Sequence, residues 1–369
     1  MVVNPYATEV QALDVATVEL VSAFHRSLPG YAVTPLVEAP ALAAELGVGE
    51  VWVKDESSRL GMPSFKILGA SWATYRAFCA RAGLDHTAGR GVDELRMALR
   101  ALPPLTLVAA TDGNHGRAVA RMAGLLGLAA HILVPQDMVA ARVEALEGEG
   151  ARVTVVPGTY DEAVARSAEL ADDTHVVVSD TSWDGYREVP AWVIDGYATI
   201  AAEVEGQLAE RRATPPTVVA AQIGVGAFAA AMVRGFVPGG ARVVGAEPTK
   251  AACAQASIEA GELTQVGGAL DSIMAGLNCG TPSPIAWPHL RAGVTAFGAV
   301  DDADAADAMR ELAAAGVVSG ESGAAGLAGV RVFADQLQLS SDDRVLVVST
   351  EGATNPDAYQ RIVGGAAQS

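Results

Sequence analysis

The sequence predicts an α/β protein whose mostly parallel sheets are covered by helices. Short valine-rich runs alternate with alanine-rich segments of helical length along most of the 369 residues. Strands that are apolar throughout, rather than alternately apolar and polar, are typical of parallel sheets buried on both faces. A chain of this length accommodates two domains, or one large domain with an insertion.

The predicted strands cover residues 50–56, 105–111, 130–135, 151–158, 175–181, 217–224, 241–248 and 344–352. Clear helical segments lie between them at 161–173 and 301–316. Ligands of open α/β sheets bind at the carboxyl ends of the strands. The unusual motifs of this sequence follow strands or lie in loops nearby, so we expect one site that is assembled from several loops.

Composition excludes several classes of partner. Hydrophobic residues make up 50% of the chain and charged residues 18%, which allows a substantial core, and the formal net charge is −18. A surface this acidic repels nucleic acids and anionic membranes, so we expect neither as a partner.

The apolar run Thr217–Val233 is interrupted by Gln222, Gly224 and Gly226. It therefore indicates a strand, a turn and a helix rather than a membrane span.

The cysteines and the first residues indicate the compartment. Cys79, Cys253 and Cys279 are far apart and form no CxxC pair, so we expect no disulfide framework and no metal site. Cys253 and Cys279 flank loops near the expected site, where they form either a local, reversible disulfide or two inert thiols. Residues 1–10 lack the basic and apolar pattern of a secretory signal. We expect a cytoplasmic protein.

A polar hexapeptide, TDGNHG, follows the predicted strand at 105–111 and precedes a helix. A carboxylate at such a position either caps the helix or faces a ligand, and both interpretations stay open for Asp112. His115 is interpreted as a residue that orients the loop rather than as a catalytic group.

A lysine and a glycine-rich turn are the next candidates. Lys66 lies in PSFKILGA among apolar neighbours. A desolvated lysine has a lowered pKa and can form a Schiff base, although an exposed lysine at a helix start also fits the pattern.

Gly224 and Gly226 in QIGVGAFAAA let backbone amides approach a phosphate at a helix N-terminus, or form a plain tight turn. The turn is no complete GxGxxG, so a dinucleotide or ATP site is not indicated.

Taken together and in this order, these motifs resemble those of the fold type II pyridoxal-phosphate enzymes, the tryptophan synthase β-subunit and threonine dehydratase group. The segments KDESSRLGMPSFKILGA, TDGNHGRAVA, DTSWDGY, AGLNCGTPSP, SGESGAAGL and STEG are most similar to those of the diaminopropionate ammonia-lyases. The resemblance covers residues 34–354.

The resemblance implies a fold of two open, twisted, mostly parallel sheets flanked by helices. Residues 1–75 and 191–369 would form a large cofactor-binding domain, and residues 76–190 a smaller mobile domain inserted in it. Closure of the smaller domain would complete the site. The resemblance also implies a homodimer.

The resemblance assigns residues to the cofactor and to the substrate. Pyridoxal phosphate would be held by a Schiff base to Lys66, and its ring hydroxyl by Asn114. Ser349, with Thr350 as the alternative, would meet the pyridine nitrogen. The phosphate would be bound by Gly224, Val225, Gly226 and Ala227. An amino acid substrate would be bound by Thr111, Asp112, Gly113, His115, Asp180 and Glu321.

The implied reaction is α,β-elimination of ammonia from 2,3-diaminopropionate, in the L and possibly the D form, which yields pyruvate and two ammonia molecules. Lys66, Asp112 and Asp180 are the expected catalytic residues, because a base must remove the Cα proton and a carboxylate must keep the leaving amine charged. A serine or threonine dehydratase, a β-replacement enzyme and a non-catalytic amino acid sensor remain as alternatives.

Overall fold

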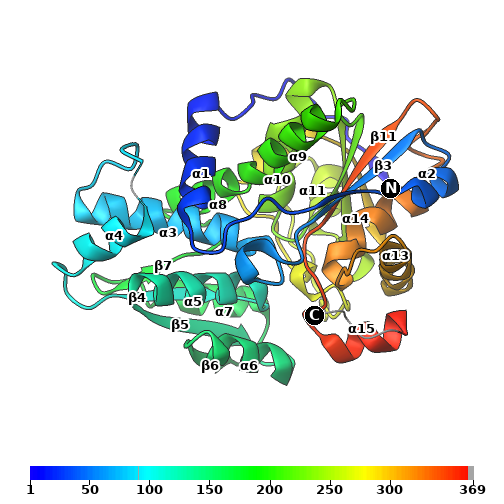
Figure 1. Ribbon diagram of the computed structural model, residues 1–369. Helices are drawn as coiled ribbons and strands as arrows, with labels where there is room; N and C mark the ends of the chain where they lie inside the picture. The colour runs from blue at the N-terminus through cyan, green and yellow to red at the C-terminus, as the bar shows by residue number, and fades with distance from the viewer. Residues whose placement is uncertain (90, 365–369) are drawn as a thin grey trace.

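Two separate β-sheets surrounded by helices form the framework of the protein (Figure 1). The computed structural model describes residues 1–89 and 91–364. The larger sheet has seven strands in the order β1-β10-β9-β8-β11-β3-β2, and the smaller has four in the order β6-β5-β4-β7. The α/β class predicted from the sequence is confirmed.

Parallel pairing dominates both sheets; among the strands of the described residues, β1 pairs with β10 and β2 with β3 in antiparallel fashion. The strands of the larger sheet are β1 (Val2–Val3), β2 (Leu36–Glu38), β3 (Glu50–Asp55), β8 (Val218–Gln222), β9 (Arg242–Pro248), β10 (Val294–Val300) and β11 (Arg344–Ser349). Those of the smaller sheet are β4 (Thr106–Ala110), β5 (Ala129–Pro135), β6 (Arg152–Val156) and β7 (His175–Val177). Every residue of the central strand β8 is buried, as expected for a sheet covered on both faces.

Helices cover both sheets. They are α1 (Val15–Ser27), α2 (Pro40–Leu46), α3 (Lys66–Ala82), α4 (Val92–Leu99), α5 (Asn114–Leu126), α6 (Ala140–Gly148), α7 (Tyr160–Ala168), α8 (Glu188–Gly196), α9 (Ala198–Arg211), α10 (Ala227–Phe236), α11 (Cys253–Ala260), α12 (Trp287–Gly293), α13 (Asp302–Ala314), α14 (Glu321–Val332) and α15 (Pro356–Val363). Among the described residues no helix has both the length and the apolar character needed to cross a membrane.

Each of the eight predicted strands overlaps an observed strand. The short strands β1 and β2 were not predicted from the sequence, and neither was β10. Its run VTAFGAV contains Gly298, which weakens the strand pattern. A Cβ at Gly298 would lie 2.1 Å from the ring carbon Cε2 of Phe333, so the glycine makes room for that ring. The glycine that weakens the sequence signal is therefore needed for packing.

The helix predicted at 161–173 is shorter in the structure. It begins at Tyr160 after the N-cap residue Thr159, and the side chains of Thr159 and Glu162 accept hydrogen bonds from each other's backbone amides in a capping box. It ends at Ala168, and Oδ1 of Asp172 then accepts hydrogen bonds from the amides of Thr174 and His175, each at 2.7 Å. This local side-chain bonding stabilises a turn instead of another helical turn.

All four strands of the smaller sheet fall within residues 76–190, the segment predicted to form the second domain. The predicted boundary at residue 76 falls inside α3, which packs against both α5 and α8. The movement of this segment stays a prediction.

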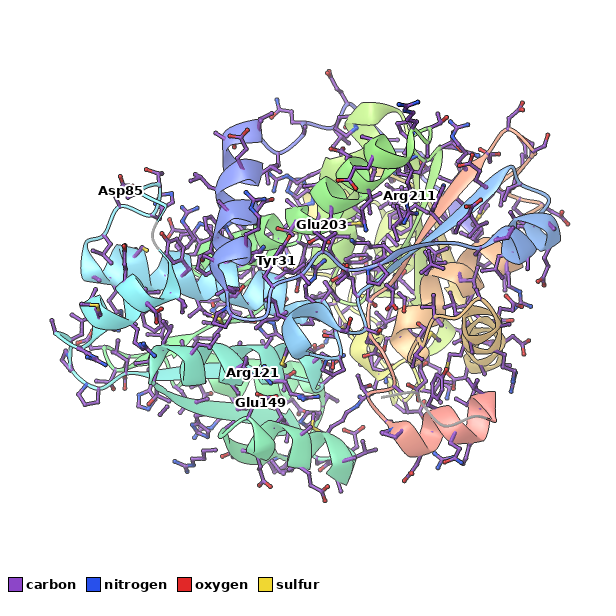
Figure 2. All side chains as sticks on the ribbon, in the orientation of Figure 1. Tyr31, Asp85, Arg121, Glu149, Glu203 and Arg211 are labelled. Carbon is purple, nitrogen blue, oxygen red and sulfur yellow. The ribbon has the colours of Figure 1, made fainter. Side chains whose placement is uncertain are left out.

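A buried ionic cluster fixes the chain that leads into α3. Glu203 on α9 accepts hydrogen bonds from Lys54 at 2.7 Å and from Arg59 at 2.6 Å, and Tyr31 donates to the same carboxylate at 2.7 Å (Figure 2). Arg59 also donates to Glu56 at 2.7 Å. Each charged group of the cluster is therefore paired inside the protein, as buried charges require.

Candidate active site

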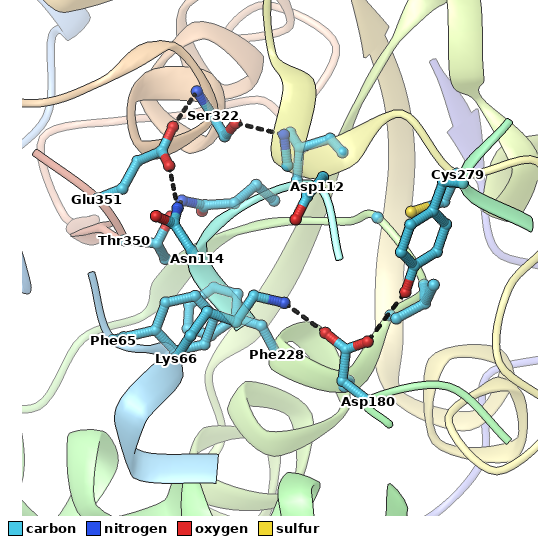
Figure 3. Close-up of a pocket in the computed structure, with 18 residues that line it drawn as sticks. Phe65, Lys66, Asp112, Asn114, Asp180, Phe228, Cys279, Ser322, Thr350 and Glu351 are labelled. Carbon is cyan, nitrogen blue, oxygen red and sulfur yellow. Dashed lines mark hydrogen bonds and ion pairs between the residues drawn. The ribbon is translucent and has the colours of Figure 1, made fainter. Parts of the chain in front are cut away.

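The motifs singled out in the sequence meet at one cavity (Figure 3). Its lining includes Asp112 after β4, Asp180 after β7, Gly224 after β8 and Thr350 after β11, so residues from both sheets contribute. The space is about 640 Å³, part of it open to solvent.

Lys66 is the lysine that lines this cavity. The sequence contains three lysines, Lys54, Lys66 and Lys250. Lys54 is fully buried in the ionic cluster around Glu203, and Lys250 is exposed and paired with acidic side chains at the surface. The structure thus leaves Lys66 as the amine positioned to react with a bound carbonyl group.

The backbone before Lys66 is fastened to the loop after β11. The amide of Phe65 donates to the carbonyl of Thr350 at 3.1 Å, and the amide of Gly352 donates to the carbonyl of Pro63 at 2.9 Å. The lysine therefore begins α3 at a fixed distance from the hydroxyl and carboxylate that follow β11.

Lys66 forms an ion pair with Asp180. Its Nζ lies 2.6 Å from Oδ2 of Asp180, and the hydroxyl of Tyr160 donates to Oδ1 at 3.1 Å. Burial by itself lowers the pKa of Lys66, but the nearby Asp180 carboxylate raises it above the ordinary lysine value. In turn, Lys66 opposes the effect of burial and holds the pKa of Asp180 below its usual range. The lowered pKa predicted for Lys66 is therefore wrong in this structure, because the distance to Asp180 cannot be read from the sequence.

Hydrogen bonds of Thr111 and His115 fix the shape of the TDGNHG loop. Oγ1 of Thr111 accepts hydrogen bonds from the amides of Gly113 and Gly116, both at 2.9 Å, and Nε2 of His115 is 2.8 Å from the carbonyl oxygen of Val178. The described residues that line the cavity do not include Thr111, Gly113 or His115. These three residues shape the loop, as expected for His115, and their proposed substrate contacts stay predictions.

Asp112 and Asn114 are the members of this loop that line the cavity. Gly113 is the N-cap residue of α5, and no side chain caps this helix, so the interpretation of Asp112 as a helix cap is wrong. Burial raises the pKa of Asp112, although the positive charge of Lys66 opposes the shift. A carboxylate with a raised pKa beside a reactive amine is suited to proton transfer.

The turn after β8 fits a phosphate group. Gly226 has a φ of 94°, and a Cβ there would lie 2.7 Å from Cδ1 of Leu290. A Cβ at Gly224 would lie 3.0 Å from the carbonyl oxygen of Gly276. No side chain caps α10, which begins at Ala227, so its first amides point to the turn without a side-chain acceptor. Gly224, Val225, Gly226 and Ala227 all line the cavity, and an anion is favoured at such a helix N-terminus.

Thr350, rather than Ser349, presents its hydroxyl at the cavity. Ser349 is fully buried and donates to Oγ of Ser319 at 2.8 Å, and the described residues lining the cavity include Thr350 but not Ser349. Oγ1 of Thr350 accepts a hydrogen bond from Nε2 of Gln222 at 2.6 Å. Since its oxygen accepts this bond, the threonine hydroxyl keeps its proton for another acceptor, such as a pyridine nitrogen.

Glu321 is placed beside the cavity rather than on its wall. It lines an adjoining cavity that shares Asp112 and Tyr160 with the first. Its predicted contact with substrate stays a prediction.

The sequence reasoning assigned no cofactor or substrate contact to several residues that line the cavity. They are Tyr160, Gln222, Gly276, Cys279, Ser322 and Glu351. Gln222 ends β8 and Glu351 lies two residues beyond β11, so the rule that ligands bind at strand ends could have found both. Gly276 and Cys279 lie in the irregular segment between α11 and α12, where no periodic pattern predicts which residues face a ligand.

All three cysteines are buried, and none of them forms a disulfide within the described residues. Sγ of Cys253 donates to the carbonyl oxygen of Gly224 at 3.8 Å, and Cys279 lines the cavity. Of the two outcomes considered for Cys253 and Cys279, the structure shows two thiols whose burial raises their pKa and makes them poor nucleophiles.

Comparison with known proteins identifies the family. A family model described as pyridoxal-phosphate dependent enzyme matches residues 28–351. The diaminopropionate ammonia-lyase of Salmonella typhimurium is 37% identical, with 93% of this chain and 91% of the relative covered. The chain belongs to the diaminopropionate ammonia-lyases. The fold type II architecture and the use of pyridoxal phosphate predicted from the motifs are thereby confirmed.

Solved structures of diaminopropionate ammonia-lyase show the same architecture. The Escherichia coli enzyme in complex with D-serine has a TM-score of 0.91 and 35% identity, with 98% of this chain and 95% of the other covered. The same enzyme in complex with an aminoacrylate-PLP azomethine reaction intermediate has a TM-score of 0.88 and 34% identity over the same shares.

Proposed function

We propose that the enzyme eliminates ammonia from 2,3-diaminopropionate. The placement of two carboxylates, Asp112 and Asp180, beside the Lys66 amine is the observation that carries this proposal. When Lys66 gives up its proton, Asp180 becomes a buried carboxylate without a cation. Such a charge is costly unless it is paired again. A β-ammonium group on the substrate supplies that cation, whereas the hydroxyl of serine does not.

The residues that line the cavity also support a proposed arrangement of the cofactor. Lys66 would bind its aldehyde carbon and Asn114 its ring oxygen, and Thr350 would donate to its pyridine nitrogen. The phosphate would be bound by the turn Gly224–Ala227. When bound, pyridoxal phosphate draws electron density from Cα of the substrate and makes the Cα proton removable. Thr350 carries no negative charge that would keep the pyridine nitrogen protonated.

The side chains of the cavity then carry the protons. Lys66 takes the Cα proton from the L-isomer, and the electron pair of that bond forms the Cα=Cβ double bond. The Cβ–N bond breaks at the same time, and Asp180 keeps the leaving nitrogen protonated until ammonia departs. The released aminoacrylate tautomerises and reacts with water to yield pyruvate and the second ammonia.

Asp112 would serve the D-isomer. A base on one face of a planar cofactor reaches the Cα proton of one stereoisomer, so turnover of both isomers needs a second base. Asp112 lines the same cavity, and burial raises the pKa of its carboxyl group. Its charge also acts on the Lys66 amine, where it adds to the effect of Asp180 in raising the pKa of the lysine. We therefore assign it as the base for D-2,3-diaminopropionate.

A panel of β-substituted amino acids tests the proposal. Initial rates of pyruvate formation are compared for 2,3-diaminopropionate, serine, threonine and β-chloroalanine, together with the ammonia released. We expect the highest kcat/KM for 2,3-diaminopropionate, with two ammonia molecules per pyruvate. A higher kcat/KM for serine or threonine would assign the enzyme to the dehydratases instead.

The variant Asp180→Asn sharpens this test. Chloride leaves β-chloroalanine without a proton, so the role proposed for Asp180 applies to the amine and not to the halide. We expect turnover of 2,3-diaminopropionate to fall by about 10²–10⁴-fold, the usual effect of losing a general acid or base, and turnover of β-chloroalanine to fall much less. Equal losses on both substrates would show that Asp180 acts on the cofactor or the fold rather than on the leaving amine.

We further infer that the enzyme is a cytoplasmic homodimer. The three buried thiols without disulfides suit a reducing compartment, and the dimer follows from the family resemblance. Light scattering on the purified enzyme at micromolar concentration should yield twice the mass of the chain; the mass of one chain would contradict it.

A further inference from the structure

Glu351 joins Asn114, in the TDGNHG loop, to the larger sheet. It is buried, at 2% exposure, and lies in the loop after β11. Its Oε2 accepts a hydrogen bond from Nδ2 of Asn114, the first residue of α5, and its Oε1 accepts one from the amide of Ser322 at 3.1 Å (Figure 3). The steps proposed above make no use of this carboxylate, so its presence in the cavity wall needs another explanation.

The surroundings of Glu351 hold its carboxylate and its backbone in place. The amide of Ser322 belongs to the first turn of α14, where backbone donors attract an anion. The carbonyl oxygen of Glu351 accepts a hydrogen bond from the amide of Gly320 at 2.9 Å. A Cβ at Gly323 would lie 2.6 Å from that same oxygen, so the backbone is tightly enclosed.

An ionised carboxylate can only accept hydrogen bonds, whereas an asparagine amide has one side that donates and one that accepts. Glu351 therefore requires Nδ2, and not Oδ1, of Asn114 to face it. Nδ2 carries two hydrogens, and Glu351 uses one of them. The second hydrogen remains for another acceptor in the cavity.

We propose that Glu351 is a positioning residue that sets the orientation of the Asn114 amide, so that Asn114 offers a donor to the ring oxygen of pyridoxal phosphate. The inference rests on the proposed contact between Asn114 and the cofactor and on no property of the substrate.

The substitution Glu351→Gln should reverse the orientation of the Asn114 amide. Oε1 of the new glutamine must still accept from the amide of Ser322, because an N–H group cannot accept that bond. Its Nε2 then faces Asn114, and two NH₂ groups cannot bond to each other. The Asn114 amide must rotate to present Oδ1, which places an acceptor where the cofactor requires a donor.

The test uses purified protein reconstituted with pyridoxal phosphate and no substrate. An N–H donor stabilises the ionised ring oxygen of the bound cofactor, so its loss shifts absorbance from the visible band to the near-ultraviolet band. We expect this shift in Glu351→Gln, together with roughly tenfold weaker binding of pyridoxal phosphate, the usual effect of one lost hydrogen bond. A wild-type band ratio and a wild-type affinity would overturn the proposal.

Glu149→Gln is the matched control. Glu149 accepts hydrogen bonds from Arg117 and from Arg121 on α5, the latter at 2.6 Å (Figure 2). It is not among the described residues that line the cavity. This variant weakens a side-chain contact of the same helix. We expect it to lower the Tm without changing the band ratio. A band shift as large as that of Glu351→Gln would show that any loosening of α5 has this effect, and would overturn the specific role of Glu351.

A double variant covers the case in which Glu351→Gln does not fold. In Asn114→Asp/Glu351→Gln, Nε2 of the glutamine donates to the new aspartate, so the bond between α5 and the β11 loop is restored. The aspartate, however, has no N–H for the ring oxygen. We expect a folded protein whose bound cofactor still shows the shifted spectrum. A wild-type spectrum would mean that the pair only joins the two elements, and would overturn the proposal. Because no substrate is present, these results do not depend on whether 2,3-diaminopropionate is turned over.

Discussion

Nζ of Lys66 lies 2.6 Å from Oδ2 of Asp180, and this ion pair joins the start of α3 to the loop after β7. The amine that must react with the cofactor is thus held in its protonated form by the carboxylate proposed to act on the leaving amine. Proton transfer away from Lys66 and binding of a cationic substrate are coupled, because both change the charge that faces Asp180.

The first prediction concerns the capture of the cofactor. Only the neutral amine reacts with an aldehyde, and Asp180 raises the pKa of Lys66. In Asp180→Asn that effect is lost and burial lowers the pKa, so the pH profile for cofactor linkage should move to lower pH. At a pH below the midpoint, a tenfold larger acid dissociation constant makes the reaction about tenfold faster. Stopped-flow absorbance with apoenzyme measures it, and Asp137→Asn, at an exposed position, serves as the control. An unmoved profile in Asp180→Asn would disprove the coupling.

The second prediction concerns the site of linkage. Borohydride reduction of the holoenzyme should attach the cofactor to the peptide that contains Lys66. Peptide mapping by mass spectrometry tells the three lysines apart, and label on Lys54 or Lys250 would refute the assignment. In Lys66→Ala we expect no covalent label and a lower Tm, because Asp180 is left as a buried carboxylate without its cation.

The third prediction concerns stereochemistry. The variant Asp112→Asn should bind the cofactor and retain much of its activity on the L-isomer. Its turnover of D-2,3-diaminopropionate should fall by about 10²-fold or more, since it lacks the base proposed for that isomer. Separate kcat/KM values for the two isomers decide the matter. Equal losses on both would assign Asp112 to the leaving amine instead.

The fourth prediction concerns stability. Arg59 and Lys54 overcome the effect of burial and lower the pKa of Glu203 from 4.5 to about 2. A group whose pKa is depressed on folding stabilises the protein above its unfolded pKa, and this contribution is lost as the pH falls through the folded pKa. Glu203→Gln should therefore lower the free energy of unfolding by about 3–5 kcal/mol at pH 7. Its difference from wild type should shrink as the pH falls from the unfolded to the folded pKa of Glu203.

Urea denaturation at several pH values measures this difference. The control is Glu169→Gln, which breaks the exposed pair between Arg166 and Glu169 and should change stability by less than about 1 kcal/mol. If the two variants were equally stable at pH 7, the buried cluster would not be what fixes the segment before Lys66.

The sequence predicted the framework of the site well because strand ends are marked by local patterns. The valine-rich runs locate β4, β7, β8 and β11, and the polar or glycine-rich residues directly after them supply Asp112, Asp180, the Gly224–Ala227 turn and Thr350. The strand β10 was missed because Gly298 interrupts its pattern, although the glycine is there to admit the ring of Phe333.

Side-chain direction and charge were harder to predict. Ser349 and Thr350 are adjacent hydroxyls at the end of one strand, and only the fold shows that Ser349 turns to Ser319 while Thr350 faces the cavity. The pKa of Lys66 was predicted from its apolar neighbours in sequence, but the group that sets it is 114 positions away. The partnership of Asn114 with Glu351 spans 237 positions, so no local pattern could reveal it.

Internal competition tests the central claim most directly. Equal concentrations of 2,3-diaminopropionate and L-serine are mixed with the holoenzyme in one vessel, and the loss of each amino acid is followed over time. The ratio of their initial rates of loss equals the ratio of kcat/KM. The proposed pairing of Asp180 with a β-ammonium group predicts that 2,3-diaminopropionate is consumed first, by a factor on the order of 10² or more, with two ammonia molecules released per pyruvate. Consumption of serine at an equal or greater rate would contradict it.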